Sequence, residues 1–212
     1  MKSYILWDHD GVLVDTEHWY YEATRQAIEP LGVILERSRY LADMALGRSA
    51  WEQARALGAT EAAVREHRQA RDVLYQHYLR TEDIGIDGVT DVLAALAADY
   101  RMAIVTTAKR ADFDLIHRDR DIVQYMRFVL ASGDYPRAKP APDPYLAALA
   151  RFEASPDDAI VVEDSERGLA AAVAAGIDCV VVDNAFVRGQ DFSAATHRIG
   201  DLRELPGLLA TL

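Results

Sequence analysis

Residues 4–16 read YILWDHDGVLVDT, an apolar run that ends in two carboxylates one residue apart. On an extended strand the side chains of Asp8 and Asp10 point the same way and lie roughly 6.5 Å apart. Two like charges that close in a partly desolvated site repel each other. Such a pair therefore indicates a bound cation, a shared proton or two carboxyl groups with different catalytic tasks. The alternative is a solvated turn, because Asp-Gly is a common turn pair.

Beyond this stretch, short runs rich in β-branched residues alternate with helical segments rich in alanine and leucine. This alternation is typical of βαβ units that build a parallel sheet. The chain is therefore predicted to be an α/β protein with a doubly wound parallel sheet. The expected strands are Tyr4–Trp7, Met102–Thr106, Phe128–Ala131, Ala159–Glu163 and Cys179–Asp183. The expected helices of this part are Val89–Asp99, Ala111–Gln124, Pro144–Phe152 and Arg167–Ala175.

The rhythm changes directly after the first strand. From about Asp15 to Ile86 the sequence contains no convincing strand but several amphipathic helices, among them His18–Ile28 and Glu61–Leu79. We predict that residues 15–86 form a small helical domain inserted into an α/β core of residues 1–14 and 87–212.

Polar residues follow four of the predicted strands, at or shortly after the point where each strand ends. In doubly wound sheets, ligands bind at the carboxyl ends of the strands. Each polar group alone has an ordinary explanation, such as a helix cap or a solvated loop. Their coincidence at one edge of one sheet indicates a functional site. In chain order the residues are Asp8, Asp10, Thr106, Thr107, Lys139, Glu163, Asp164 and Ser165.

Four segments resemble, in order and spacing, the motifs of the haloacid dehalogenase-like superfamily of phosphoryl-transfer enzymes. They are DHDGVLVDT (8–16), IVTT (104–107), AKPAPDPY (138–145) and VVEDSERGLAAAVAAG (161–176). The resemblance covers residues 1 to about 185. It implies a Rossmann-like core with a mobile cap, here of the inserted helical type. His9 departs from the pattern, because the family usually carries an apolar or aromatic residue at this position.

The resemblance also implies roles for four catalytic residues. Asp8 is the expected nucleophile, which forms an aspartyl-phosphate. Asp10 is the expected acid and base, which protonates the leaving group and then deprotonates the attacking water. Thr106 and Lys139 are expected to hold phosphate oxygens, and Lys139 also restrains Asp8.

The implied cofactor is Mg²⁺, a hard cation that prefers oxygen ligands. The expected ligands are Asp8, the backbone carbonyl of Asp10, and Asp164, with help from Glu163. A cation in this position makes the crowded carboxylates tolerable and screens the nucleophile from the charge of the phosphate.

Further residues are candidates for binding the substrate. In the core these are His9, Gly11, Thr107 and Ser165. In the insertion, the segment LGRSAWEQA (46–54) offers Arg48, next to Ser49 and Trp51. Arg48 could bind a carboxylate or a second phosphate as a fork. A solvated arginine at the start of a helix is an equally good interpretation.

The predicted function is Mg²⁺-dependent hydrolysis of a small phosphorylated metabolite, a phosphomonoester. The main alternative is a sugar phosphomutase of the β-phosphoglucomutase type, for which we expect a histidine at the cap hinge and a lysine in the cap. Tyr20 stands where that histidine is expected, with His18 nearby, and the insertion has no lysine. That lack also argues against a phosphonatase, and Asp10 argues against a haloacid dehalogenase. More remote alternatives are a phospho-aspartate signalling receiver and a degenerate binding protein.

Composition limits the partners. The formal net charge of -11 argues against nucleic acid, because phosphate backbones are bound by basic surfaces. The only cysteine, Cys179, lies in an apolar run and is expected to be a buried strand thiol. We find no membrane span or signal peptide and expect a cytoplasmic protein, a monomer or a weak dimer.

Overall fold

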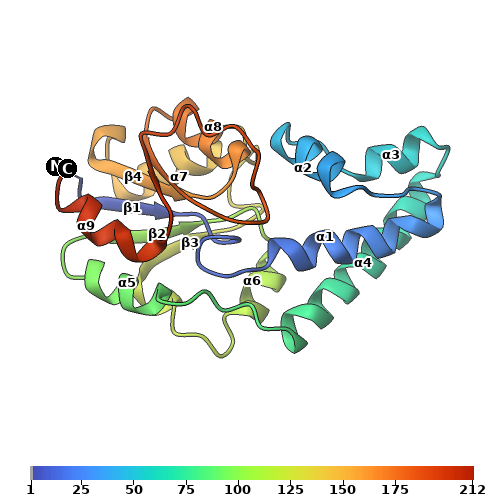
Figure 1. The fold of residues 1–212 in the computed structure, drawn as a ribbon, viewed down its shortest axis with the longest axis horizontal. Coiled ribbons are helices and arrows are strands. Elements are labelled where there is room, and N and C mark those ends of the chain that lie inside the picture. Colours follow the sequence, from blue (N-terminus) through green and yellow to red (C-terminus); the bar gives the residue numbers. More distant parts are fainter. Residues whose placement is uncertain (1) are drawn as a thin grey trace. The chain divides into compact units, whose positions relative to one another are not determined.

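The computed structural model describes residues 2–212, which include a six-stranded sheet whose neighbouring strands are all parallel (Figure 1). The strand order is β3-β2-β1-β4-β5-β6. Strands β1, β2 and β4 are apolar and almost completely buried, as expected where helices cover both faces of a parallel sheet. The predicted doubly wound α/β fold is confirmed. The strands are β1 (Tyr4–Trp7), β2 (Arg101–Val105), β3 (Met126–Leu130), β4 (Ala159–Glu163), β5 (Asp178–Val182) and β6 (His197–Ile199).

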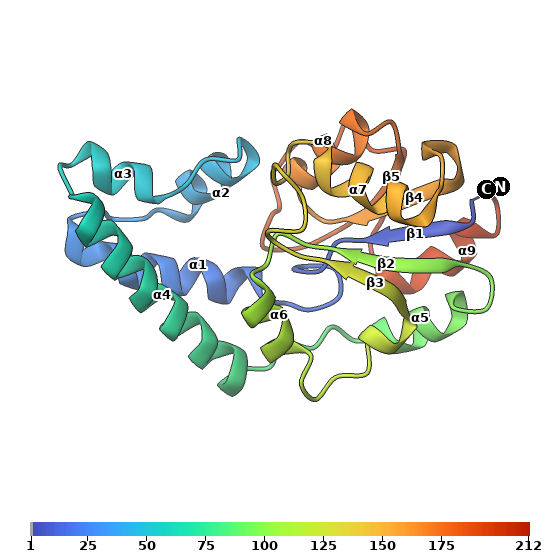
Figure 2. The ribbon, with the colours of Figure 1, turned by 180° about the vertical axis from the view of Figure 1, so that it is seen from behind.

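Helices cover both faces of this sheet (Figure 2). Helices α7 (Asp143–Phe152) and α8 (Glu166–Ala174) lie against one face. Helices α5 (Val89–Leu96) and α9 (Leu205–Leu209) lie against the other. Helix α6 (Arg110–Ile116) follows β2. Single 3₁₀ turns occupy Glu29–Leu31, Val123–Tyr125, Pro156–Asp158 and Leu202–Glu204.

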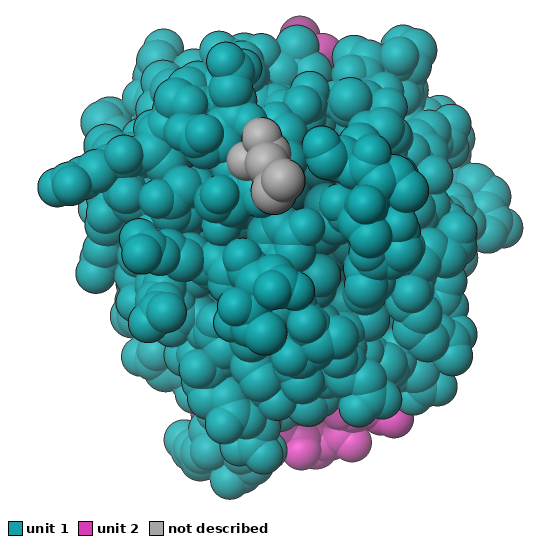
Figure 3. Space-filling view, turned by 90° about the vertical axis from the view of Figure 1, so that its left-hand side faces the viewer, with its two compact units in different colours: residues 1–15, 85–212 teal, residues 16–84 magenta. Residues whose placement is uncertain are grey.

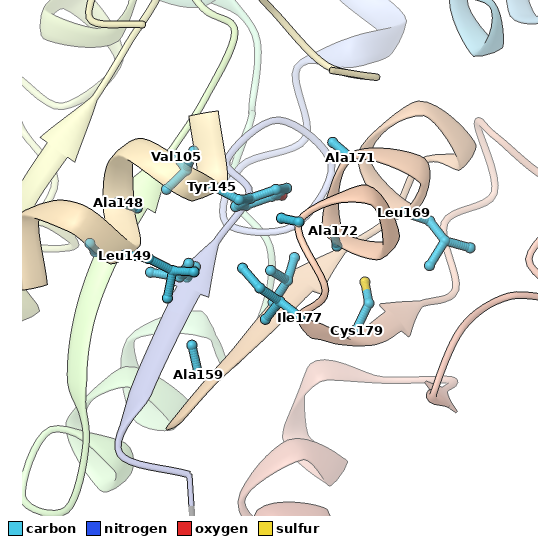
Figure 4. Close-up of a cluster of buried hydrophobic side chains, with 14 of the residues drawn as sticks. Val105, Tyr145, Ala148, Leu149, Ala159, Leu169, Ala171, Ala172, Ile177 and Cys179 are labelled. Carbon is cyan, nitrogen blue, oxygen red and sulfur yellow. The ribbon is translucent and has the colours of Figure 1, made fainter. Parts of the chain in front are cut away.

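One cluster of buried apolar side chains lies between α7, α8 and the sheet (Figure 4). Tyr145 on α7 is fully buried there, beside Ala148 and Leu149, which follow it by three and four residues on the same face of the helix. Cys179 on β5 is 1% exposed in the same core, and burial raises the pKa of its thiol. The expectation of a buried strand thiol is therefore confirmed.

The chain divides into two compact units, residues 2–15 with 85–212 and residues 16–84 (Figure 3). The first unit holds the sheet and the second is helical. The helices of the second unit are α1 (Glu17–Ile28), α2 (Arg37–Ala45), α3 (Trp51–Ala56) and α4 (Glu61–Thr81). Helix α4 has 21 residues but carries charges throughout, and no helix within residues 2–212 combines the length and apolarity needed to cross a membrane.

Helix α1 packs along α4 inside the second unit. Tyr20 on α1 meets Tyr75 on α4 edge to face, with ring centroids 5.1 Å apart. The guanidinium of Arg71 lies 4.4 Å from the centre of the Tyr20 ring, and Arg71 donates to Asp72 Oδ1 at 2.9 Å. Helix α4 begins at a side-chain cap, because Thr60 Oγ1 accepts the N–H of Ala63.

Three elements differ from the sequence prediction. The five-residue helix α9, Leu205–Leu209, was not expected. Strand β6, His197–Ile199, was not expected, because three residues between polar flanks give no clear alternating pattern. The helix expected over Ala111–Gln124 ends at Ile116. His117 leaves helical geometry there, with φ -95° and ψ 6°, and the following Arg-Asp-Arg-Asp segment offers no apolar residue that could pack onto the sheet.

Candidate active site

Asp8 lies at the carboxyl end of β1 and is held by Lys139. The backbone N–H of Asp8 donates to the Val162 carbonyl at 2.8 Å and so extends the pairing of β1 with β4. Lys139 Nζ donates to Asp8 Oδ1 at 2.6 Å, to Glu163 Oε1 at 2.8 Å and to the Val105 carbonyl at 2.9 Å. These acceptors use all three protons of the ammonium. Burial alone would lower the pKa of Lys139, but the charges of Asp8 and Glu163 outweigh it and raise the pKa.

Glu163, the last residue of β4, is fully buried and both of its carboxylate oxygens are occupied. Oε1 accepts from Lys139 and from the Tyr145 hydroxyl at 2.8 Å. Oε2 accepts from the Ser165 hydroxyl at 3.0 Å and from the N–H groups of Asp164 and Ser165. Burial alone would raise the pKa of Glu163, but the charge of Lys139 and these hydrogen bonds have a larger, opposite effect. The pKa of Glu163 is therefore lower than its ordinary value.

Asp8, Glu163 and Asp164 form a buried acidic cluster. Each offers a carboxylate oxygen, and these oxygens lie within 4.8 Å of one another. The pKa of Asp8 is raised to about 6, by burial first and by the charge of Glu163 second, against the opposing effect of Lys139. A hard divalent cation would relieve this repulsion, and the all-oxygen donor set fits such a cation.

Asn184 and Gly11 fix the position of Asp164. Asn184 Nδ2 donates to Asp164 Oδ2 at 2.7 Å and to the Gly11 carbonyl at 3.3 Å. Gly11 has a φ of 87°, and a Cβ at this position would lie 1.9 Å from Asp164 Oδ2. The glycine after the two aspartates is therefore required by both its backbone conformation and the close approach of Asp164.

Asp10 turns its carboxylate toward Thr106, the residue after β2. The Thr106 hydroxyl accepts the N–H of Ala108 at 3.0 Å, so its own proton is free to be donated to Asp10 Oδ2 at 3.1 Å. Thr106 is fully buried, whereas the Asp10 side chain keeps 15% of its surface exposed. Thr106 thus donates to one of the two carboxylate oxygens of Asp10.

The remaining residues predicted from the sequence lie in different places. Thr107 Oγ1 accepts from Arg167 at 3.4 Å, and the Ser165 hydroxyl caps α8 by accepting the N–H of Gly168 at 3.2 Å. His9, predicted to contact substrate, is fully buried and contacts Phe113, His117 and Asp10. Arg48 belongs to the second unit and is exposed just before α3.

Sequence reasoning missed Tyr145 and Asn184, which hold Glu163 and Asp164, and His117, which contacts His9. Tyr145 ends the third motif, but nothing in the sequence showed that its hydroxyl would reach Glu163. Asn184 lies two residues after the end of β5, so the rule that polar residues gather at the carboxyl ends of strands could have found it. His117 is remote in sequence, and no pattern links it to His9.

Comparison with known proteins identifies the family. A sequence model of the family described as haloacid dehalogenase-like hydrolase matches residues 5–182. The chain belongs to this family. The resemblance seen in the sequence motifs is thereby confirmed, and the chain is a hydrolase of this family with an α/β, Rossmann-like core.

Individual members of the family are similar over most of the chain. Protein CbbY of Rhodobacter capsulatus is 30% identical over 210 residues, which cover 93% of this chain and 92% of CbbY. The mitochondrial (DL)-glycerol-3-phosphatase 1 of Arabidopsis thaliana is 31% identical over 193 residues, 85% of this chain and 63% of that protein. A crystal structure of a CbbY variant from Rhodobacter sphaeroides with xylulose 1,5-bisphosphate superimposes with a TM-score of 0.81. At 24% identity over 97% of this chain and 96% of that one, it shows the shared fold.

Proposed function

We propose that this chain is a Mg²⁺-dependent phosphatase that hydrolyses a small phosphorylated metabolite through an aspartyl-phosphate on Asp8. The observation that carries the proposal is the geometry around Asp8. Its carboxylate ends β1 in a buried oxygen cluster, with one oxygen held by Lys139 at 2.6 Å. The phosphatase named among the relatives supports the choice of a phosphomonoester as substrate.

In the proposed reaction, the Asp8 oxygen not bound by Lys139 attacks phosphorus. The new O–P bond forms as the bond to the alcohol oxygen breaks, and that oxygen leaves with the electron pair and takes a proton from Asp10. Asp10 then removes a proton from water, which attacks phosphorus and releases Asp8 and inorganic phosphate. Asp10 ends the cycle protonated, as it began.

Asp8, Asp164 and the carbonyl of Asp10 would hold Mg²⁺, with Glu163 as a further candidate ligand. When bound, the cation supplies positive charge that neutralises phosphate oxygens. Glu163 already accepts hydrogen bonds at both oxygens, so its main contribution is to position Lys139 and the start of α8. Lys139 holds Asp8 in place and, with Thr106, is proposed to bind phosphate oxygens.

The helical unit of residues 16–84 is proposed to be the cap that selects the substrate, inserted into an α/β core domain. Arg48 is its candidate for contacting a carboxylate or a second phosphate of the substrate. Gly11, Thr107 and Ser165 remain candidates for the core side of the binding site. The proposed partner is a small metabolite rather than nucleic acid, given the net charge of -11.

The test is a screen of phosphorylated metabolites with Mg²⁺ that follows both inorganic phosphate and isomerised product. Glycerol phosphates, phosphoglycolate, xylulose 1,5-bisphosphate and sugar monophosphates come first. β-Glucose 1-phosphate is supplied with a trace of glucose 1,6-bisphosphate. Phosphate release from monoesters without isomerisation supports the phosphatase. Rapid isomerisation with little phosphate release would establish the mutase instead.

A further inference from the structure

The side-chain amide of Asn184 is held by three hydrogen bonds beside the acidic cluster. Asn184 Nδ2 donates to Asp164 Oδ2 at 2.7 Å and to the Gly11 carbonyl at 3.3 Å. Asn184 Oδ1 accepts the backbone N–H of Phe186 at 2.8 Å. Because one end of the amide meets acceptors and the other end meets a donor, the hydrogen bonds determine which end is nitrogen and which is oxygen.

The amide, the Asp164 carboxylate and the backbone of Gly11 are in close contact. Asp164 is 1% exposed. A Cβ on Gly11 would lie 1.9 Å from Asp164 Oδ2 and 2.7 Å from Asn184 Nδ2. Asn184 therefore joins the aspartate that follows β4 to the loop that carries Asp8 and Asp10, and the position of its amide is coupled to both.

The segment that follows Asn184 is anchored as well. Phe186 and Val187 are buried. Further along, Gln190 Oε1 accepts the N–H of Glu166, in the first turn of α8, at 2.8 Å. The segment is thus fixed at the acidic cluster, in the core and at α8. A side chain that orients a metal ligand needs such support from its own surroundings.

We propose that Asn184 is a positioning residue for the metal ion: it holds the Asp164 carboxylate in place for the cation and ties it to the loop whose Asp10 carbonyl is another proposed ligand. Ligating carboxylates are commonly oriented by hydrogen bonds from neighbouring groups, and loss of such a partner typically costs about 10- to 100-fold in metal affinity or activity. An amide suits this task, because it donates a hydrogen bond without adding charge. The inference rests on the proposed metal site and adds the residue that orients one of its ligands.

Two amides of the same segment separate this role from a purely structural one. Asn184 donates to a proposed ligand, whereas Gln190 accepts a backbone N–H of α8. The variants are Asn184→Leu, which is uncharged and similar in volume, and Asn184→Ala, which places no branched apolar group against the carboxylate. Gln190→Leu is the matched control. Titration calorimetry with Mg²⁺ and no substrate measures Kd, and phosphate release is then followed at increasing Mg²⁺ concentration.

We expect both Asn184 variants to raise the Kd for Mg²⁺ by about tenfold or more, and Gln190→Leu to change it by less than about twofold. Phosphate release by the Asn184 variants should fall at low Mg²⁺ and recover at saturating Mg²⁺. An unchanged Kd in both Asn184 variants, or equal changes at the two positions, would overturn the inference.

Failure of the metal site itself gives a different result. A wild-type protein that binds no Mg²⁺ would refute the proposed site together with the role of Asn184. If the wild type binds Mg²⁺, Asp164→Asn weakens this binding and the Asn184 variants bind normally, only the role of Asn184 is refuted.

Discussion

At the scale of single residues, the site is an excess of buried negative charge arranged around one ammonium. Lys139 neutralises one carboxylate's worth of charge, yet Asp8, Glu163 and Asp164 all lie within reach of each other. The surroundings stabilise the charged form of Glu163 more than that of Asp8, because the pKa of Glu163 is lowered while that of Asp8 is raised to about 6. Of the two, Asp8 is the carboxylate whose charged form the protein stabilises less, which fits its proposed role as a nucleophile that works with a cation.

Replacing Asp8 by asparagine tests the nucleophile. Asp8→Asn should abolish phosphate release while leaving the far-UV circular dichroism spectrum unchanged, because the amide has the same shape but is a poor nucleophile. Asp15→Asn is the matched control, since Asp15 is exposed at the end of the same segment, and should keep full activity. An Asp8→Asn enzyme that keeps about a tenth or more of the wild-type rate would point to direct attack by water.

Replacing Lys139 by methionine tests the buried ion pairs. In metal-free buffer, Lys139→Met should lower the free energy of unfolding by about 3–5 kcal/mol, because it leaves Asp8 and Glu163 buried without a counter-charge. Arg137→Met is the control, since the Arg137–Asp143 pair lies at the surface and its loss should change the free energy of unfolding far less.

The deficit of Lys139→Met should also depend on pH. Without the ammonium, the raised pKa of Asp8 rises further and the lowered pKa of Glu163 also rises, so the folded variant binds more protons than the folded wild type. The deficit should therefore shrink as the pH falls toward and below about 6, where Asp8 is protonated even in the wild type. Urea unfolding at several pH values measures it, and a deficit independent of pH would contradict the assignment to buried charge.

At the scale of elements, the start of α8 is packed against Glu163 through a glycine. A Cβ on Gly168 would lie 1.8 Å from Glu163 Oε1, whereas one on Gly207 in the short helix α9 would meet no atom within 4 Å. Gly168→Ala should lower the free energy of unfolding by about 1–3 kcal/mol, because the side chain or the helix must move.

Activity should fall with Gly168→Ala as well, since Glu163 holds Lys139. Gly207→Ala should leave activity unchanged and raise the free energy of unfolding by about 0.5–1 kcal/mol, as expected for alanine in a helix. Thermal melts and phosphate-release assays of both variants decide the matter. Equal stability of the two would show that the helix accommodates the clash without cost.

How far the elements follow from sequence depends on how local their causes are. Strand β1, its two aspartates and Gly11 share one local pattern, and the carboxyl-end rule extends it to Thr106, Lys139 and Asp164. The length of α6 could not be predicted, because it ends where its apolar face ends rather than at a proline or glycine. The contact of His9 with His117 spans 108 positions and depends on packing around Phe113, which no local pattern encodes.

At the scale of the whole molecule, the chain passes from the sheet unit to the helical unit and back, once after Asp15 and once before Gly85. The first crossing comes directly after the loop that carries Asp8 and Asp10. Any rearrangement of the helical unit is therefore linked through the backbone to the loop that carries the proposed nucleophile and acid. This connectivity is a reason to place substrate selection in residues 16–84 and chemistry in the sheet unit.

Binding of Mg²⁺ should stabilise the whole molecule, because a ligand that binds only the folded state adds RT ln(1 + [L]/Kd) to its stability. At one hundred times Kd this amounts to about 2.7 kcal/mol, which a thermal melt detects as a rise in Tm that EDTA reverses. Asp164→Asn should lose most of this rise while keeping an oxygen that can accept from Asn184. Asp183→Asn, which removes an equal charge from an exposed position at the end of the next strand, should keep the rise in Tm.

A wild-type Tm that does not respond to Mg²⁺, together with full activity in excess EDTA, would contradict a metal site in the acidic cluster. Ca²⁺ should raise Tm but support little activity, because its larger and less regular shell changes how Asp8 is presented to phosphorus.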